Sequence, residues 1–298
     1  MRRIAVVGRC QAAGIGDALM HMVDDCEVHS FVAQESYRDR MLPHAQKALA
    51  ECDLIFSHYL YADHGFYSTE NLRKEFGEVI LIPPVVFSGF QPDCIDLIVG
   101  HVNYPSPLGS CHSAIVAAAY SLDVPSDRVE TLFNKFVYQR LGYYQEFARA
   151  RTYLHSSMKA FGIDISGEWP DWVRSGVFMH SYNHPKPIVL ASLAKLLAIK
   201  AGLVPANTPT PELGFDFLSH FPIWPVYPEI AQALGTKGSY TFKKAGTPVL
   251  IEGTHTLMGL REFVQKSYEL YGDVPQEAFD LPVVAKTREV LAPLLIGS

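Results

Sequence analysis

Residues 4–17 read IAVVGRCQAAGIGD, an apolar run rich in valine that ends at Gly8 and leads within a few residues into a helical pattern. This order is typical of the first strand and helix of a parallel sheet. The same alternation continues along the N-terminal half, which therefore predicts an α/β fold with a parallel sheet there. The expected strands are Ile4–Val7, Val28–Val32, Leu54–Ser57, Val79–Ile82 and Ile95–Val99, and the expected helices are Ile15–Val23 and Tyr37–Ala50.

The pattern becomes mainly helical from Ser110 onward. The expected helices are Ser113–Leu122, Asp127–Phe136 behind an N-cap at Ser126, Tyr138–Phe161 with an internal glycine, Ile188–Ile199 and Leu260–Tyr271. A short strand is expected at Tyr240–Phe242, and the proline-rich stretch Val204–Pro228 is expected to be an ordered loop. Since no linker interrupts the chain, we predict a single domain over residues 1–298. In it, residues 1–109 are mainly α/β sheet, and residues 110–298 are mainly helical and contribute the His180–Pro185 loop.

Composition and charge exclude several classes of protein. The 31 acidic and 25 basic residues give a net charge of -6 and form no long run of either sign, so we expect no nucleic-acid partner. No apolar segment approaches the ~20 residues that span a bilayer, so we expect no membrane insertion. The five cysteines form no CxxC pair, which argues against a disulfide framework or a zinc knuckle and indicates a reducing, cytoplasmic location.

Cys10 follows the first predicted strand, at the sheet edge where open α/β proteins bind ligands. The helix that begins after it presents free N–H groups and a positive dipole end, which lower the pKa of a thiol and can hold an oxyanion or a phosphate. The amide of Gln11 is a candidate oxyanion donor. Two interpretations stay open: Cys10 is a nucleophile, or it is a small residue that fills a buried corner. Leu19 stands where a dinucleotide-binding GxGxxG needs its third glycine, so that fingerprint is absent.

A second informative segment is MHSYNHP, residues 179–185. A residue before proline avoids the helical region, so His184 is predicted to lie in a loop, where it can act as a general base. His180 or Asn183 could orient it. The two histidines four residues apart resemble a zinc-binding HExxH, but Ser181 replaces the glutamate and Pro185 disfavours the helix, so no metal is expected. Loop histidines that bond only to backbone are the plain alternative.

Other polar residues are candidates for ligand contact. Ser57 and His58 close the third predicted strand and so reach the same sheet edge as Cys10. Gly100 and His101 follow a later strand. Lys243 is expected to be a solvated charge, although one basic group there could meet a phosphate.

The chain resembles the WcbI family of polysaccharide-biosynthesis enzymes over most of its length. The resemblance is carried by VVGRCQ, DLIFSHY, LIPPVVFSGFQPD, HSAIVAAAYSLDVPSDRVETLF, HSYNHPKP and GSYTFK. The family's opening motif is similar to GNCQ, so its cysteine and glutamine map onto Cys10 and Gln11. Arg9 replaces the asparagine, and its planar fork suits a coenzyme A phosphate.

The arrangement also looks like a cysteine version of the SGNH or GDSL hydrolases, with an SGNH- or flavodoxin-like sheet. In those enzymes a DxxHP segment supplies the base, whereas Ser181 stands here in the aspartate's place. His184 therefore lacks that orienting carboxylate or takes another from elsewhere.

The resemblance implies an acetyl-coenzyme A-dependent O-acetyltransferase that acts on a sugar of a capsular or other surface polysaccharide. Its expected partners are a small-molecule acyl donor and a sugar acceptor, and a homo-oligomer stays open. The expected catalytic residues are Cys10, His184, Gln11 and His180, and the expected cofactor-binding residues are Arg9, Ser57, His58, Asn183 and Lys243. The alternatives are a cysteine-dependent thioesterase or SGNH-like hydrolase and a non-catalytic coenzyme A- or nucleotide-binding protein.

Overall fold

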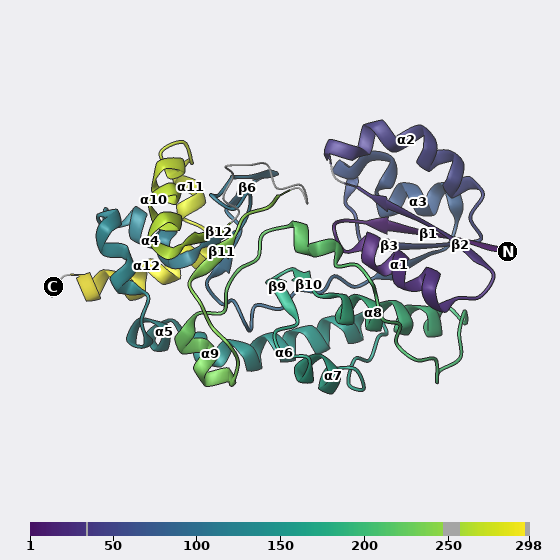
Figure 1. Ribbon diagram of the computed structural model, residues 1–298. Helices are drawn as coiled ribbons and strands as arrows, with labels where there is room; N and C mark the ends of the chain where they lie inside the picture. The colour runs from purple at the N-terminus through teal and green to yellow at the C-terminus, as the bar shows by residue number, and fades with distance from the viewer. Residues whose placement is uncertain (34, 247–256, 296–298) are drawn as a thin grey trace. The chain divides into compact units, whose positions relative to one another are not determined.

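The computed structural model describes residues 1–33, 35–246 and 257–295 (Figure 1). The chain forms two compact units that alternate along the sequence. The first unit comprises Met1–Val86, Tyr153–Phe178 and His184–Leu218, and the second comprises Phe87–Thr152, Met179–Asn183 and Ser219–Ser298. The single-domain organisation, with a mainly sheet portion over residues 1–109 and a mainly helical portion over residues 110–298, stays a prediction.

The first unit contains a four-stranded sheet in the order β2-β1-β3-β4, and every neighbouring pair is parallel. Its strands are β1 (Arg2–Gly8), β2 (Cys26–Val32), β3 (Leu54–His58) and β4 (Val79–Ile82). The predicted α/β class with an N-terminal parallel sheet is confirmed. The register places Val7 beside Ser57, so the carboxyl ends of β1 and β3 reach the same edge.

Helices cover both faces of this sheet, as Figure 1 shows. The helices are α1 (Ala12–Met22) and α8 (Pro187–Lys200) on one face, and α2 (Glu35–Ala50) and α3 (Thr69–Phe76) on the other. Residues Ile4 to Gly8 are all buried because β1 is central and has helices above and below it. Successive side chains of a strand point to opposite faces, so Ala5 and Val7 face α2 and α3.

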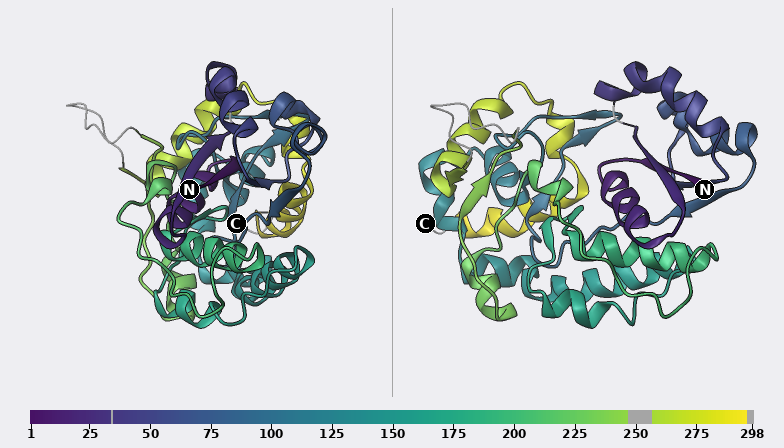
Figure 2. Two further views of the ribbon diagram at one scale, coloured as in Figure 1. Left: turned by 90° about the vertical axis from the view of Figure 1, so that its right-hand side faces the viewer. Right: turned by 45° about the vertical axis from the view of Figure 1, so that its right-hand side comes forward.

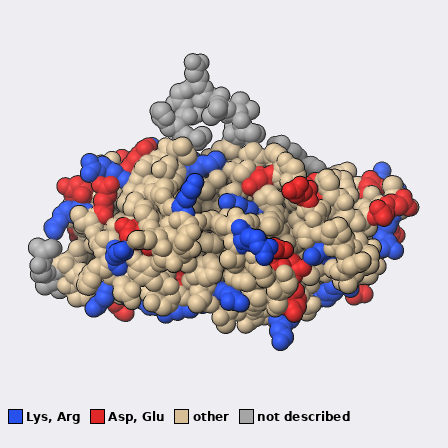
Figure 3. Space-filling view, turned by 60° about the horizontal axis from the view of Figure 1, so that its bottom comes forward, with Lys and Arg blue, Asp and Glu red and all other residues tan. Residues whose placement is uncertain are grey.

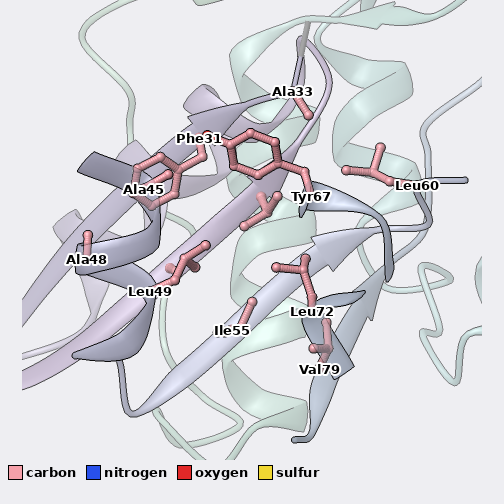
Figure 4. Packing of buried hydrophobic residues seen from close by; sticks show 12 residues of the cluster. Phe31, Ala33, Ala45, Ala48, Leu49, Ile55, Leu60, Tyr67, Leu72 and Val79 are labelled. Atoms are coloured by element: carbon pink, nitrogen blue, oxygen red, sulfur yellow. The ribbon is translucent and has the colours of Figure 1, made fainter. Parts of the chain in front are cut away.

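The core between the sheet and α2 and α3 is a continuous apolar cluster (Figure 4). Phe31 and Tyr67 supply its large rings, and Leu49 and Leu72 come from the two helices. Burying apolar area contributes about 25 cal/mol per Å², so this packing stabilises the sheet on which the strand ends are mounted. The edge that carries Cys10 and His58 is therefore a rigid support.

Helix α1 is held between β2 and α8 at very close range, and α1 and α8 lie side by side in Figures 1 and 2. A Cβ at Gly14 would lie 2.5 Å from a methyl carbon of Leu190, and a Cβ at Gly16 would lie 2.0 Å from Oγ of Ser30. Both glycines thus serve close packing of the helix. This explains the GxG pattern without any phosphate-binding loop.

The remaining described elements complete the two units. The first unit also contains η1 (Ala62–Tyr67), the C-terminal part of α6 (Tyr143–Ala160), α7 (Trp169–Arg174) and β10 (His184–Pro185), and η3 (Phe217–His220) begins in it and ends in the second. The second unit contains β5 (Cys94–Ile95), β6 (Ile98–Val99), β7 (Val102–Asn103), β8 (His112–Ser113), α4 (Ala114–Ser121), η2 (Ser126–Leu132), α5 (Lys135–Leu141), β9 (Met179–Ser181), α9 (Pro228–Leu234), β11 (Thr241–Lys243), β12 (Leu257–Gly259), α10 (Leu260–Tyr271), α11 (Gln276–Phe279) and α12 (Pro282–Leu295).

The predicted fifth strand Ile95–Val99 is wrong. Two separate strands, β5 and β6, occupy this stretch, and they pair antiparallel with β8 and β7 in the second unit. Gly100 has a φ of 62°, which permits the tight turn between β6 and β7. An apolar run of this length does not distinguish two short antiparallel strands from one parallel strand.

Two helical predictions also need correction. The segment behind Ser126 is the 3-10 helix η2, whereas the side chain of Asn134 caps the following α5. Gly142 has a φ of 75° and ends α5, so the long predicted helix over Tyr138–Phe161 is in fact divided between α5 and α6.

Candidate functional site

The turn from Gly8 to Gln11 joins β1 to α1 and carries the predicted nucleophile. The backbone N–H of Ala12 donates to the carbonyl of Arg9 at 2.9 Å, which closes the turn. Arg9 is exposed, Cys10 is partly buried and Gln11 is 5% exposed. The backbone N–H of Gln11 is directed at the sulfur of Cys10. The thiol therefore lies at the carboxyl end of a parallel strand, as the sequence predicts.

Burial raises the pKa of the Cys10 thiol to about 11. The backbone N–H of Gln11 and the positive charge of Arg9 lower this pKa, but they are the smaller effects. The net direction is opposite to the one expected from the helix end alone. Cys10 is thus a protonated thiol at neutral pH in the ligand-free protein, and any nucleophilic role requires a base.

The side chain of Gln11 forms a clamp with the backbone of Val85, just beyond β4. Its Nε2 donates to the carbonyl of Val85 at 2.9 Å, and the N–H of Val85 donates to its Oε1 at 3.1 Å. The oxygen of this amide and one of its two N–H groups thus fix the turn. The donor that Gln11 directs at Cys10 is its backbone N–H.

Ser57 and His58 lie at the end of β3, as predicted, but they differ in their contacts. The hydroxyl of Ser57 donates to the carbonyl of His58 at 2.8 Å, so it holds the backbone. His58 is 6% exposed, and both of its ring nitrogens lack a hydrogen-bond partner among the described residues. Burial, helped by the charge of Arg9, lowers the pKa of His58 to about 4, so the ring is neutral at physiological pH.

His184 belongs to the first unit, together with Cys10 and His58. It is buried in the short strand β10, so its predicted position in a loop is wrong, although the extended backbone expected before Pro185 is present. Helix α8 begins two residues after β10 and packs against α1 through Leu190 and Gly14. His184 thus lies just before α8, and α8 packs beside α1, the helix that follows Cys10.

His180, Asn183 and Lys243 belong to the second unit. The carbonyl of His180 accepts from the N–H of Trp224 at 2.7 Å, and the hydroxyl of Ser181 donates to Oδ1 of Asn183 at 3.1 Å. The ammonium of Lys243 donates to three backbone carbonyls, the shortest contact being 2.8 Å to Ser219. Lys243 is therefore a structural cation, which differs from the solvated charge expected from the sequence.

The second unit contains a buried carboxylate that sequence reasoning missed. Asp93 accepts hydrogen bonds from the hydroxyls of Ser113, Tyr143 and Tyr227 and from the N–H of Ile115. Burial raises its pKa to about 6, although all four hydrogen bonds act in the opposite direction. Asp93 ends the LIPPVVFSGFQPD segment that carries part of the family resemblance, but the sequence does not show which hydroxyls converge on it, so only the fold reveals this cluster.

We expect Asp93 to make the protein less stable as the pH rises from about 4 to about 6. The folded carboxyl keeps its proton up to about pH 6, whereas the unfolded one loses it near 3.8, so the folded state binds more protons in this window. The free energy of unfolding should fall by up to about 3 kcal/mol across it.

Urea unfolding of wild type and Asp93→Asn at several pH values measures this effect. The variant is not expected to match the wild-type stability, because the NH₂ of its amide cannot accept the same hydrogen bonds, so the two slopes against pH are the quantity to compare. Identical slopes would contradict the prediction.

Three further features concern other classes of site. Within residues 1–33, 35–246 and 257–295, no group of three or more His, Cys, Asp or Glu could hold a metal ion. No helix in the same ranges is long and apolar enough to cross a membrane. Acidic and basic side chains are interspersed on the face drawn in Figure 3.

Comparison with known proteins gives two matches. The family described as the polysaccharide biosynthesis enzyme WcbI matches residues 3–206, which is more than half of the chain. A solved structure of WcbI has 16% sequence identity, a TM-score of 0.66, and covers 98% of this chain and 95% of its own. It is described as the native protein without a disulfide bond between coenzyme A and one of its cysteines. No curated protein matches the chain. The structural likeness shows a shared fold.

Proposed function

This chain belongs to the WcbI family of polysaccharide biosynthesis enzymes, and from that membership we propose that it is an acetyl-coenzyme A-dependent O-acetyltransferase. Its acceptor is a sugar of a capsular or other surface polysaccharide. The observation that carries the proposal is the position of Cys10, at the carboxyl end of β1 with the N–H of Gln11 directed at its sulfur. The description of the solved WcbI structure, which names coenzyme A together with a cysteine, supports the choice of donor. The family name supports the acceptor.

The proposed reaction has two steps. His184 accepts the proton of the Cys10 thiol, and the thiolate attacks the acetyl carbonyl, so that a new C–S bond forms as the bond to coenzyme A breaks. The leaving thiolate takes the proton from His184. In the second step His184 accepts the proton of a sugar hydroxyl, which attacks the acetyl-cysteine and regenerates the Cys10 thiol. A base is required because burial holds the pKa of Cys10 at about 11.

A second version uses the same residues without a covalent intermediate. His184 then deprotonates the sugar hydroxyl, which attacks acetyl-coenzyme A directly, and Cys10 is a thiol that lines the substrate site.

All five cysteines are free, which fits action in the reducing cytoplasm.

Arg9 is the proposed contact for a phosphate of coenzyme A. Its guanidinium is exposed beside the turn that opens α1, and its planar fork suits bidentate binding of a phosphate. We expect Arg9→Ala to raise the Kd for coenzyme A by about tenfold, measured by calorimetry. Arg2→Ala is the matched control, because Arg2 is also exposed but lies at the amino end of β1.

The calorimetry tests the proposed function as well as Arg9. If wild type does not bind coenzyme A, the acyl-transfer proposal fails. If Arg2→Ala weakens binding as much as Arg9→Ala does, the role of Arg9 is general charge. Continued release of free coenzyme A from acetyl-coenzyme A without any sugar, beyond the single equivalent that acetylates Cys10, would instead favour a thioesterase. Binding with no turnover in the presence of candidate acceptors would favour a non-catalytic binding protein.

A further inference from the structure

His58 is a buried polar side chain whose ring has no partner in the described structure. It is 6% exposed, and neither Nδ1 nor Nε2 has a hydrogen-bond partner among residues 1–33, 35–246 and 257–295. Its backbone is well held, since Ser57 and Thr69 both direct hydroxyls at its carbonyl. The main chain is therefore anchored while the imidazole is left with unused hydrogen-bonding capacity.

An unpaired buried ring destabilises the folded protein. Leaving a buried donor or acceptor unsatisfied costs about 1–3 kcal/mol, and an apolar side chain of similar size would fill the same space without that cost. The ring of His58 is thus poorly explained by packing alone. Unsatisfied polar groups of this kind concentrate at sites that bind or transform a ligand.

The ring lies against the turn that carries the proposed nucleophile. A Cβ built on Gly8 would lie 2.0 Å from Nδ1 of His58, so the ring occupies the space that any larger residue at position 8 would need. Gly8 is the last residue of β1, and Cys10 follows two residues later. Arg9 lies between Gly8 and Cys10 in the sequence, and its positive charge lowers the pKa of the His58 ring.

Acyl transfer at this turn calls for donors that face the developing oxyanion. The side-chain amide of Gln11 is held by both backbone groups of Val85, which engage its oxygen and one of its two N–H groups, and the donor that Gln11 directs at Cys10 is its backbone N–H. A single donor is fewer than acyl-transfer sites usually employ. A neutral imidazole always carries one N–H, and His58 is the neighbouring side chain with an unused one.

We propose that His58 is a further catalytic residue, whose neutral ring donates a hydrogen bond to the acyl oxygen as negative charge develops on it. The inference rests on the proposed acyl transfer at Cys10. When the thiolate attacks, the carbonyl electron pair moves onto oxygen, and it returns when the thiolate of coenzyme A leaves. His58 keeps its proton throughout both changes. It is therefore an electrostatic donor, distinct from the proton-accepting role proposed for His184.

The test compares His58→Leu, which has no donor, with His58→Asn, which retains an N–H. For His58→Leu we expect the kcat for acetyl transfer to fall by about 100- to 1,000-fold, while the Kd for coenzyme A stays within about twofold of wild type. The melting temperature of the ligand-free protein should rise by roughly 2–4 °C, because two unsatisfied polar atoms are removed. His58→Asn should recover about tenfold or more of the lost rate.

The control is His44→Leu, at an exposed position of α2 in the same unit, which should leave all three quantities unchanged. A merely structural histidine gives a different pattern: His58→Leu would lower the melting temperature, and His58→Asn would not restore the rate. That pattern overturns the inference, as does a kcat within about threefold of wild type. If wild type neither binds coenzyme A nor transfers acetyl groups, the proposed function has failed, and the catalytic role of His58 is overturned with it.

Discussion

Replacing Cys10 with serine is expected to lower the rate of acetyl transfer by at least about 1,000-fold, while the Kd for coenzyme A changes by no more than about twofold. Removing a nucleophile abolishes the covalent route but leaves most binding contacts in place. A serine hydroxyl in the same buried position is a far weaker acid than a thiol, so the base cannot activate it to the same degree. Steady-state rates with acetyl-coenzyme A and a sugar acceptor, together with calorimetry, measure the two quantities.

Cys52→Ser is the matched control for this experiment. Burial raises the pKa of Cys52 to about 11 as well. This residue precedes the amino end of β3, whereas Cys10 follows the carboxyl end of β1. Its thiol donates to the carbonyl of Ala48 at 3.2 Å, so it has a structural contact. Mass spectrometry of wild type incubated with acetyl-coenzyme A alone should show one acetyl group on Cys10. A fully active Cys10→Ser variant would reject the covalent route and leave the direct one.

Replacing His184 with glutamine is expected to lower the rate of acetyl transfer by about 100- to 10,000-fold, the range contributed by a general base. The effect should be large because burial keeps the pKa of Cys10 near 11, so the thiolate is scarce at neutral pH without a base. Iodoacetamide labelling of Cys10 at pH 7 should slow in the same variant. The rate in both proteins should rise as the pH approaches the pKa of the thiol.

His21→Gln is a suitable control, since His21 is a half-exposed histidine in the last turn of α1, the same helix that follows Cys10. It should label and turn over like wild type. Equal labelling and turnover in wild type and His184→Gln would remove His184 from the mechanism. The base would then have to be sought among other groups near the Cys10 turn.

The sequence was sufficient to predict the four strands of the parallel sheet and the placement of Cys10. Strands such as Ile4–Val7 and Leu54–Ser57 are runs of apolar residues bounded by polar ones, and the rule that ligands bind at the carboxyl ends of parallel strands needs only the strand order. Helix α10 was predicted at its observed bounds because its apolar residues recur with helical spacing.

What the sequence could not predict depends on contacts between distant residues. The amide of Gln11 is fixed by hydrogen bonds with the backbone of Val85, a partner 74 residues away. The lone Asp93 becomes a buried acceptor only when two tyrosines and a serine converge on it. Strands of two residues, such as β5 and β6, are too short to show any periodicity, so their antiparallel pairing is fixed by tertiary packing.

The alternation of the two units along the chain has a consequence for biosynthesis. The apolar face of α1, which includes Ile15 and Leu19, is buried in part against α8. Helix α8 leaves the ribosome only after the whole of Phe87–Thr152, a segment of the other unit, has been made. Domains usually fold as units during synthesis, but this unit must wait for α8 with the surface that α8 covers, including part of α1, exposed. The nascent chain is therefore expected to engage chaperones that bind exposed apolar surface until α8 emerges.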